Sequence, residues 1–238
     1  MRKPIQILLL FIGVFSHKTN AQTITETFGT GANQFSIDFV QIGNPGNKAD
    51  TTGSPNPAGS VSYDYCLSKY EISRDMVVKA NAEGQLGLSL QDMASYGGNG
   101  TNRPATGISW NEAAKFVNWL NTSKGYPPAY NFTSSGRNKN ISLWPDEHHV
   151  EGNKFRNKDA FYFLPSLDEW YKGAYGSPNG TWYKYATGSN RLPKAVGGGT
   201  AAGTVVYNQS THKGPSDIKN AGGLSSYGTM AQNGSVWE

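Results

Sequence analysis

The sequence predicts one α+β domain that is rich in ordered loops and contains two or three short capped helices. Of its 238 residues, 29 are glycine and 12 are proline, while aromatic residues make up 12% and charged residues only 16%. Low charge with many aromatic residues argues against disorder, and the glycines and prolines indicate long structured loops around a modest core. A few strand patterns and two well-marked helices, without an internal repeat, complete the evidence for this class.

The first 21 residues predict a signal peptide. Arg2 and Lys3 form a basic start, residues 5–15 form an apolar run, and small residues lead to a cleavage site near Ala21. The run is much shorter than the roughly 20 apolar residues that a membrane-spanning helix needs. We therefore expect a secreted, periplasmic or cell-surface protein with no membrane span in the mature chain.

The charge balance does not suggest a polyanionic partner. The chain carries 21 basic and 17 acidic residues, and loss of Arg2, Lys3 and Lys18 with the signal peptide leaves 18 against 17. The mature chain is nearly neutral and has no Lys/Arg cluster interleaved with aromatic residues. We expect it to bind neither nucleic acid nor an anionic membrane.

Cys66 is the single cysteine, so the chain has no internal partner for a disulfide. Its neighbours Tyr65 and Leu67 belong to a strand-like run, in which a free thiol behaves as a small hydrophobic group. We predict a buried thiol rather than a reactive one.

A strand is expected at the start of the domain. Residues 22–34 read as a polar leader, and the domain is expected to begin at Phe35 and to continue to residue 238. Phe35, Ile37 and Phe39 alternate with polar residues, as in a half-buried strand, before the pattern slips by one residue.

A loop, a second strand and a helix are expected next. Residues 44–60 are rich in Gly, Pro and Asn and read as a loop, and residues 61–73 read as a strand. Ser73 then opens a helix, with Asp75 in its first turn and Gly84 as its stop signal.

Two further helices begin with S-x-x-E capping boxes, Ser109 with Glu112 and Ser166 with Glu169. The adjacent carboxylates Asp168 and Glu169 resemble a catalytic pair, but the position of Glu169 in the capping box explains it better. Three tryptophans on these helices are expected to fill the core: Trp110, Trp119 and Trp170.

The segment between these two helices, residues 126–159, is too long for an ordinary connection and is predicted to be an insertion on the functional or variable surface. It contains two carboxylates and two imidazoles side by side at Asp146–His149. Such groups suit a transition metal, but adjacent residues rarely converge on one ion. A solvated loop is therefore favoured over a metal site.

Other chemical signatures are weak. The chain has no G-x-S-x-G elbow, P-loop or dinucleotide-binding fingerprint. Glu71 and Glu238, which follow aromatic residues, fit either buried acids with a raised pKa or structural hydrogen-bond acceptors.

Four separated blocks of the chain read KYEIS, RPATGISWNEAAKFVNWLN, FYFLPSLDEWYKGAY and GGLSSYGTMAQNGSVWE. In order and spacing they resemble the sulfatase-modifying-factor (formylglycine-generating enzyme) family, and in particular a bacterial secreted subfamily. The likeness covers residues 35–238 and implies a C-type-lectin-like α+β fold. The family pattern continues past the last block, so we expect residues 35–238 to be the N-terminal part of the domain.

The resemblance also implies an activity. Enzymes of the family oxidise a cysteine of a sulfatase to formylglycine, using copper bound by a cysteine pair near the C-terminal end, and a neighbouring branch uses non-haem iron for sulfoxide synthesis. Cys66 lies in the N-terminal strand block and aligns with neither cysteine. We therefore assign no catalytic residue, and we expect copper only together with a C-terminal region that carries the pair.

The last block contributes a calcium site in enzymes of the family. Gly234, Val236 and Glu238 match the positions of its ligands, which are backbone carbonyls and one carboxylate. Ala231 stands where the family places an Asn or Asp side chain, so one ligand is absent. Calcium is the cofactor that the resemblance implies for residues of this chain.

Two functions remain open. The first is a sulfatase-modifying-factor-type domain whose parent protein oxidises a sulfatase-type substrate or keeps only the scaffold. The second is a non-catalytic module that binds a glycan or a protein at the cell surface. In the second, the binding surface is expected from residues 126–159 together with Trp182, Tyr183 and Tyr185.

Overall fold

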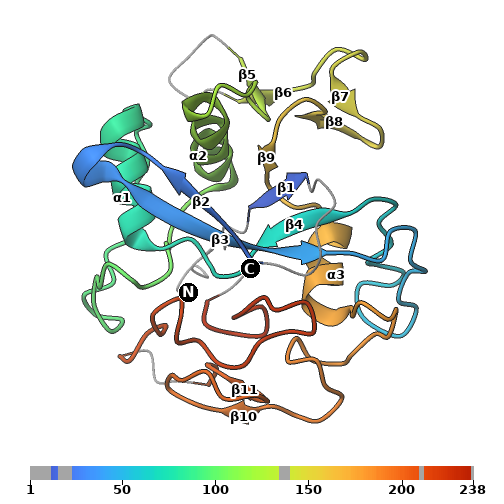
Figure 1. The fold of residues 1–238 in the computed structure, drawn as a ribbon. Helices are drawn as coiled ribbons and strands as arrows, with labels where there is room; N and C mark the ends of the chain where they lie inside the picture. The colour runs from blue at the N-terminus through green and yellow to red at the C-terminus, as the bar shows by residue number, and fades with distance from the viewer. Residues whose placement is uncertain (1–11, 16–22, 134–139, 209–211, 237–238) are drawn as a thin grey trace, which may run out of the picture.

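The computed structural model describes residues 12–15, 23–133, 140–208 and 212–236. Within them it confirms an α+β domain, with a five-stranded sheet and three two-stranded sheets (Figure 1). The helices are α1 (Arg74–Gly84), α2 (Trp110–Ser123) and α3 (Leu167–Tyr175), preceded by a short 3-10 helix η1 (Gly31–Asn33). The strands are β1 (Gly13–Phe15), β2 (Ile24–Phe28), β3 (Phe35–Ile42), β4 (Tyr65–Ser68), β5 (Asn131–Phe132), β6 (Ile141–Ser142), β7 (His149–Val150), β8 (Asn153–Asn157), β9 (Tyr162–Phe163), β10 (Lys194–Ala195) and β11 (Thr204–Val205).

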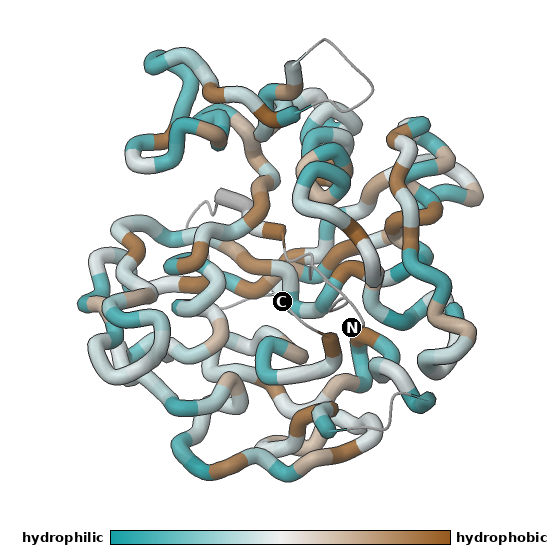
Figure 2. The backbone as a smooth tube through the Cα atoms, turned by 180° about the vertical axis from the view of Figure 1, so that it is seen from behind, coloured by the Kyte–Doolittle hydropathy of each residue, from teal (hydrophilic) through white to brown (hydrophobic). Residues whose placement is uncertain are grey.

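The central sheet has the order β2-β3-β4-β1-β9 and is antiparallel throughout. Ile37 and Phe39 of β3 pack with residues of α1 and α2, whereas Val40 and Ile42 belong to a second cluster that Trp170 of α3 joins. The sheet is thus covered on both faces, and several hydrophobic segments lie in the middle of the molecule (Figure 2). A doubly covered strand buries consecutive residues, which explains the slip in the alternation at Phe39 and Val40.

Strand β1 lies inside this sheet although its residues belong to the predicted signal peptide. It pairs with β4 on one side and β9 on the other, and the carbonyl of Ile12 accepts a hydrogen bond of 2.9 Å from the Ser68 amide. Ile12 is fully buried, and a side chain on Gly13 would collide with the ring of Phe163. A chain cleaved near Ala21 would lose this strand. The central sheet of the predicted mature form would therefore lack β1 between β4 and β9.

Two expected boundaries are corrected. Residues 22–34 are not only a polar leader, because Ile24–Phe28 form β2, which pairs with β3 along its whole length. The segment reads as polar because an edge strand exposes alternate residues to solvent. Of the strand expected within 61–73, only Tyr65–Ser68 is paired as β4.

All three helices begin at the predicted caps. The Ser73 hydroxyl accepts a hydrogen bond from the first turn of α1, and Ser109 and Ser166 take part in complete capping boxes. Helix α1 ends at Gly84, the expected stop signal, and Gln85 follows it in the left-handed conformation. A Cβ atom at Gly84 would lie 2.5 Å from the ring of Trp119, so the close packing of α1 on α2 requires glycine there.

The chain after α3 is mostly irregular and forms the lower part of Figure 1. Its two short strands, β10 (Lys194–Ala195) and β11 (Thr204–Val205), pair in parallel. Across the described ranges, no helix combines the length and the hydropathy that crossing a bilayer requires.

Candidate functional site: an aromatic groove

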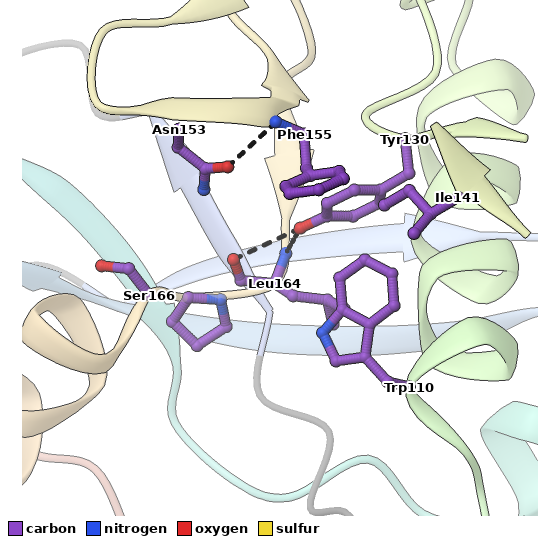
Figure 3. Close-up of a pocket in the computed structure, with 8 residues that line it drawn as sticks. Trp110, Tyr130, Ile141, Asn153, Phe155, Leu164 and Ser166 are labelled. Atoms are coloured by element: carbon purple, nitrogen blue, oxygen red, sulfur yellow. Dashed lines mark hydrogen bonds between the residues drawn. The ribbon is translucent and has the colours of Figure 1, made fainter. Parts of the chain in front are cut away.

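The insertion at residues 126–159 forms two β-hairpins that build one side of a groove. Hairpin β5–β6, hairpin β7–β8, the start of α2 and the entry to α3 surround a cavity of about 350 Å³ (Figure 3). The cavity is lined by Trp110, Tyr130, Ile141, Asn153, Phe155, Leu164, Pro165 and Ser166. Part of the insertion, which was predicted to lie on the functional or variable surface, thus lines this groove.

Two large rings of the groove remain partly open to solvent. Trp110 is 39% exposed and Phe155 is 44% exposed, values that are high for side chains of this size. The Trp110 ring meets the edge of the Tyr130 ring, with centroids 5.1 Å apart and planes at 75°. Trp110 was expected to fill the core, and that expectation is wrong: it occupies the first position of α2, at the rim of the groove.

Tyr130 forms the rigid part of the floor. Its hydroxyl accepts a hydrogen bond of 2.8 Å from the Leu164 amide, and its backbone amide donates 2.9 Å to the side chain of Asn118. Burial raises the pKa of the Tyr130 hydroxyl well above its ordinary value, so the group stays protonated. The floor is therefore a fixed, neutral surface.

The polar groups of the groove lie at its edge. Asn153 accepts a hydrogen bond of 3.2 Å from the Phe155 amide through its side-chain oxygen, which leaves its NH2 group as a donor for a ligand. The oxygen of Ser166 accepts from the Glu169 amide at 3.3 Å, which leaves the hydroxyl hydrogen as a second donor. None of the lining residues carries a charge.

The insertion's acidic and histidine-rich turn lies beside the groove and forms no metal site. The Asp146 side chain is almost fully exposed, whereas the His149 side chain is 16% exposed and is the most buried of the four. Within the described ranges, no three His, Cys, Asp or Glu side chains come together in a way that could hold a metal ion.

Other candidate residues lie away from the groove. Cys66 is 0% exposed within β4, as predicted. Glu71 is also buried, and burial raises its pKa to about 8, while the Ser235 hydroxyl acts in the opposite direction. Trp182 packs on Tyr171, with ring centroids 5.6 Å apart, so it serves the loop packing near α3 rather than the groove.

The residues expected to bind calcium are only partly described, because Glu238 lies outside the described residues. Gly234 and Val236 would contribute backbone carbonyls, but the Gly234 carbonyl already accepts a hydrogen bond of 3.1 Å from the Val236 amide. Ala231 supplies no oxygen from its side chain. Gly234 and Val236 offer only backbone carbonyls among the described residues, so calcium binding stays a prediction.

Sequence comparison places these features in a known family. Residues 25–238 match the family model described as sulfatase-modifying factor enzyme 1-like domain. Neither the curated proteins nor the solved structures contain a match to this chain. The matched range begins within β2, in agreement with the corrected start of the domain.

Proposed function

We propose, from the premise that this chain belongs to the sulfatase-modifying factor family, that it is a binding member whose aromatic groove takes a neutral oligosaccharide. The observation that carries the proposal is the pairing of open aromatic rings, Trp110 and Phe155, with an uncharged lining. A fold does not establish a function, so the argument rests on this site.

The chemistry of the groove suits a sugar ring. A pyranose presents a face of C–H groups, which packs on an aromatic ring, and a rim of hydroxyls, which need hydrogen-bond partners. Trp110 and Phe155 supply the rings, while the Asn153 side chain lies beside Phe155 and Ser166 lies on the side of the groove away from Trp110 (Figure 3). The absence of charge among the lining residues favours a neutral sugar over a sulfated or acidic one.

A peptide ligand fits this groove less well. An extended peptide needs a row of backbone donors and acceptors, which proteins usually supply from an open strand edge. Here the polar groups are two side chains, at Asn153 and Ser166, rather than a row of free backbone groups. We therefore place an apolar peptide segment second, as an outcome that the experiment can detect.

The oxidation of a sulfatase cysteine, which the family resemblance implies, is not assigned to residues of this chain. Its single thiol, at Cys66, is fully buried in the central sheet and out of reach of a protein substrate. The binding proposal needs no thiol. Secretion after cleavage near Ala21 is part of the same proposal, because a protein that binds glycans at the cell surface must present its groove outside the cell.

Binding to a panel of neutral oligosaccharides tests the proposal. Glucose, mannose and N-acetylglucosamine oligomers would be titrated calorimetrically into the chain, with an apolar peptide and a sulfated oligosaccharide as comparisons. We expect Trp110→Ala or Phe155→Ala to weaken sugar binding at least tenfold, about 1.4 kcal/mol or more. Leu192→Ala, at an exposed position away from the groove, is the matched control and should leave the affinity unchanged.

Two results would contradict the proposal. One is sugar binding that is insensitive to both aromatic substitutions while Leu192→Ala also has no effect. The other is tight binding of the peptide with none of the sugars. Circular dichroism and unfolding curves of each variant would separate lost binding from lost folding.

A further inference from the structure

We infer that the protonation state of His149 regulates the groove, so that its ligand binds more tightly in mildly acidic than in mildly alkaline solution. This inference rests on the proposed function, because it concerns the same groove. It is carried by the hydrogen-bond geometry of one imidazole ring.

His149 lies on the strand that supports a wall of the groove. It is in β7, where it pairs with Asn157 of β8, and β8 carries the lining residues Asn153 and Phe155. The His149 side chain is 16% exposed, so it is held against the hairpin rather than free in solvent. A change in its contacts therefore acts on the strand pair that positions Phe155.

Both ring nitrogens of His149 face acceptors. Nδ1 lies 2.9 Å from the carbonyl oxygen of Val150, and Nε2 lies 3.3 Å from Oδ1 of Asp146. A carbonyl and a carboxylate can only accept, so both contacts are hydrogen bonds only when each ring nitrogen carries a hydrogen. A neutral imidazole has one donor and one lone pair, and only the imidazolium form satisfies both contacts.

Asp146 extends this contact to the groove. The same oxygen, Oδ1, lies 3.7 Å from Nζ of Lys154, which stands between Asn153 and Phe155 on β8. His149 and Lys154 thus hold the turn before β7 to the strand that carries the ligand contacts. Loss of the imidazolium proton removes one of the two cations and places a lone pair against either the carbonyl or the carboxylate.

The size of the effect is limited by solvent. Asp146 is almost fully exposed, and exposed ion pairs contribute little. We expect the dissociation constant to rise about two- to fivefold between pH 5.5 and pH 8.

Other ionisable groups on the hairpin do not replicate this geometry. His148 is half exposed and lies 3.9 Å from a carboxylate oxygen of Glu147, its neighbour in sequence. Arg156 is held by Glu169 in the core. The remaining charged residues of the hairpin are Glu151 and Lys158.

The test measures affinity for the tightest oligosaccharide of the panel at pH 5.5 and pH 8. Wild type should bind about two- to fivefold more tightly at pH 5.5, and His149→Gln should bind equally at both pH values. His148→Gln is the matched control, because it removes the neighbouring imidazole and should keep the wild-type pH dependence. In parallel, NMR would follow the His149 ring nitrogens and the amides of Asn153 and Phe155 across the same range without ligand.

The outcomes separate the two proposals. If no oligosaccharide binds at either pH, the proposed function fails, and the amide signals of Asn153 and Phe155 then decide whether His149 acts on the groove. If sugars bind with the same affinity at both pH values, or if His148→Gln abolishes the pH dependence, the regulation by His149 is overturned while the binding function stands.

Discussion

Arg156 and Glu169 form a buried ion pair directly behind the aromatic groove. Nη1 of Arg156 lies 2.9 and 2.8 Å from the two carboxylate oxygens of Glu169, and Nη2 donates 2.8 Å to the hydroxyl of Tyr63. The guanidinium also lies 4.2 Å from the ring centroid of Phe163. Since Arg156 follows Phe155 on β8 and Glu169 caps α3, this pair joins two sides of the groove to the core.

The first prediction concerns this ion pair. Arg156→Met should lower the free energy of unfolding by about 3–5 kcal/mol, because it leaves the Glu169 carboxylate buried without a counter-charge. Urea unfolding would measure the loss. The double variant Arg156→Met/Glu169→Gln is the control and should recover part of it, whereas equal stability of the single variant and wild type would show that the pair is dispensable.

The second prediction concerns Glu71, whose buried carboxylate lies near the Ser235 hydroxyl but has no hydrogen bond of normal geometry among the described residues. Burial raises its pKa from 4.5 to about 8 in the folded state. The unfolded chain therefore releases this proton first, so the free energy of unfolding should fall as the pH rises from about 4.5 to about 8 and then level off. Above pH 7, thermal unfolding should show a free energy of unfolding for Glu71→Gln that exceeds that of wild type by up to a few kcal/mol. Near pH 4 the two free energies should be equal.

Equal pH profiles for Glu71→Gln and wild type would contradict that prediction.

Lys172 is also buried, and burial lowers its pKa to about 8. A lowered lysine pKa makes stability rise with pH between about 8 and 10.5. The two groups therefore act in adjacent pH windows and can be separated in one experiment.

The third prediction concerns Gly84. Replacement by alanine usually stabilises a helix by about 1 kcal/mol, but here the new Cβ would lie 2.5 Å from Trp119. Trp119 is packed against Phe35 and cannot move freely. Gly84→Ala should therefore lower the free energy of unfolding by about 1–3 kcal/mol.

Gly100→Ala is the matched control for that substitution, because its nearest contact would be an ordinary 3.5 Å to the Arg103 side chain. It should change stability by less than about 0.5 kcal/mol. A Gly84→Ala variant as stable as the control would show that Trp119 accommodates the methyl group.

The fourth prediction concerns β1. A chain that begins at Gln22 lacks this strand and the buried side chain of Ile12, so it should unfold at least about 2 kcal/mol more easily than the 238-residue chain. Urea unfolding of the two forms measures the difference, and N-terminal sequencing of the protein isolated from its cells shows whether the first 21 residues are removed. Identical unfolding midpoints would show that β1 adds nothing to the sheet.

The sequence determined the local elements because their signals are local. The caps at Ser73, Ser109 and Ser166 each depend on contacts within one helical turn, and all three were predicted correctly. The family blocks and the burial of Cys66 could also be read from the chain. Such features require no knowledge of which distant segments meet.

Only the tertiary structure decided where the groove lies. As a large aromatic residue on a capped helix, Trp110 was expected in the core. It is the first residue of α2 and remains 39% exposed, and its ring lines the groove together with residues of the two hairpins. Likewise, Glu169 could be identified as a cap, whereas its pairing with Arg156 depends on β8 folding back across the start of α3. Side chains far apart in sequence meet through packing, and packing is a property of the whole chain rather than of any single segment.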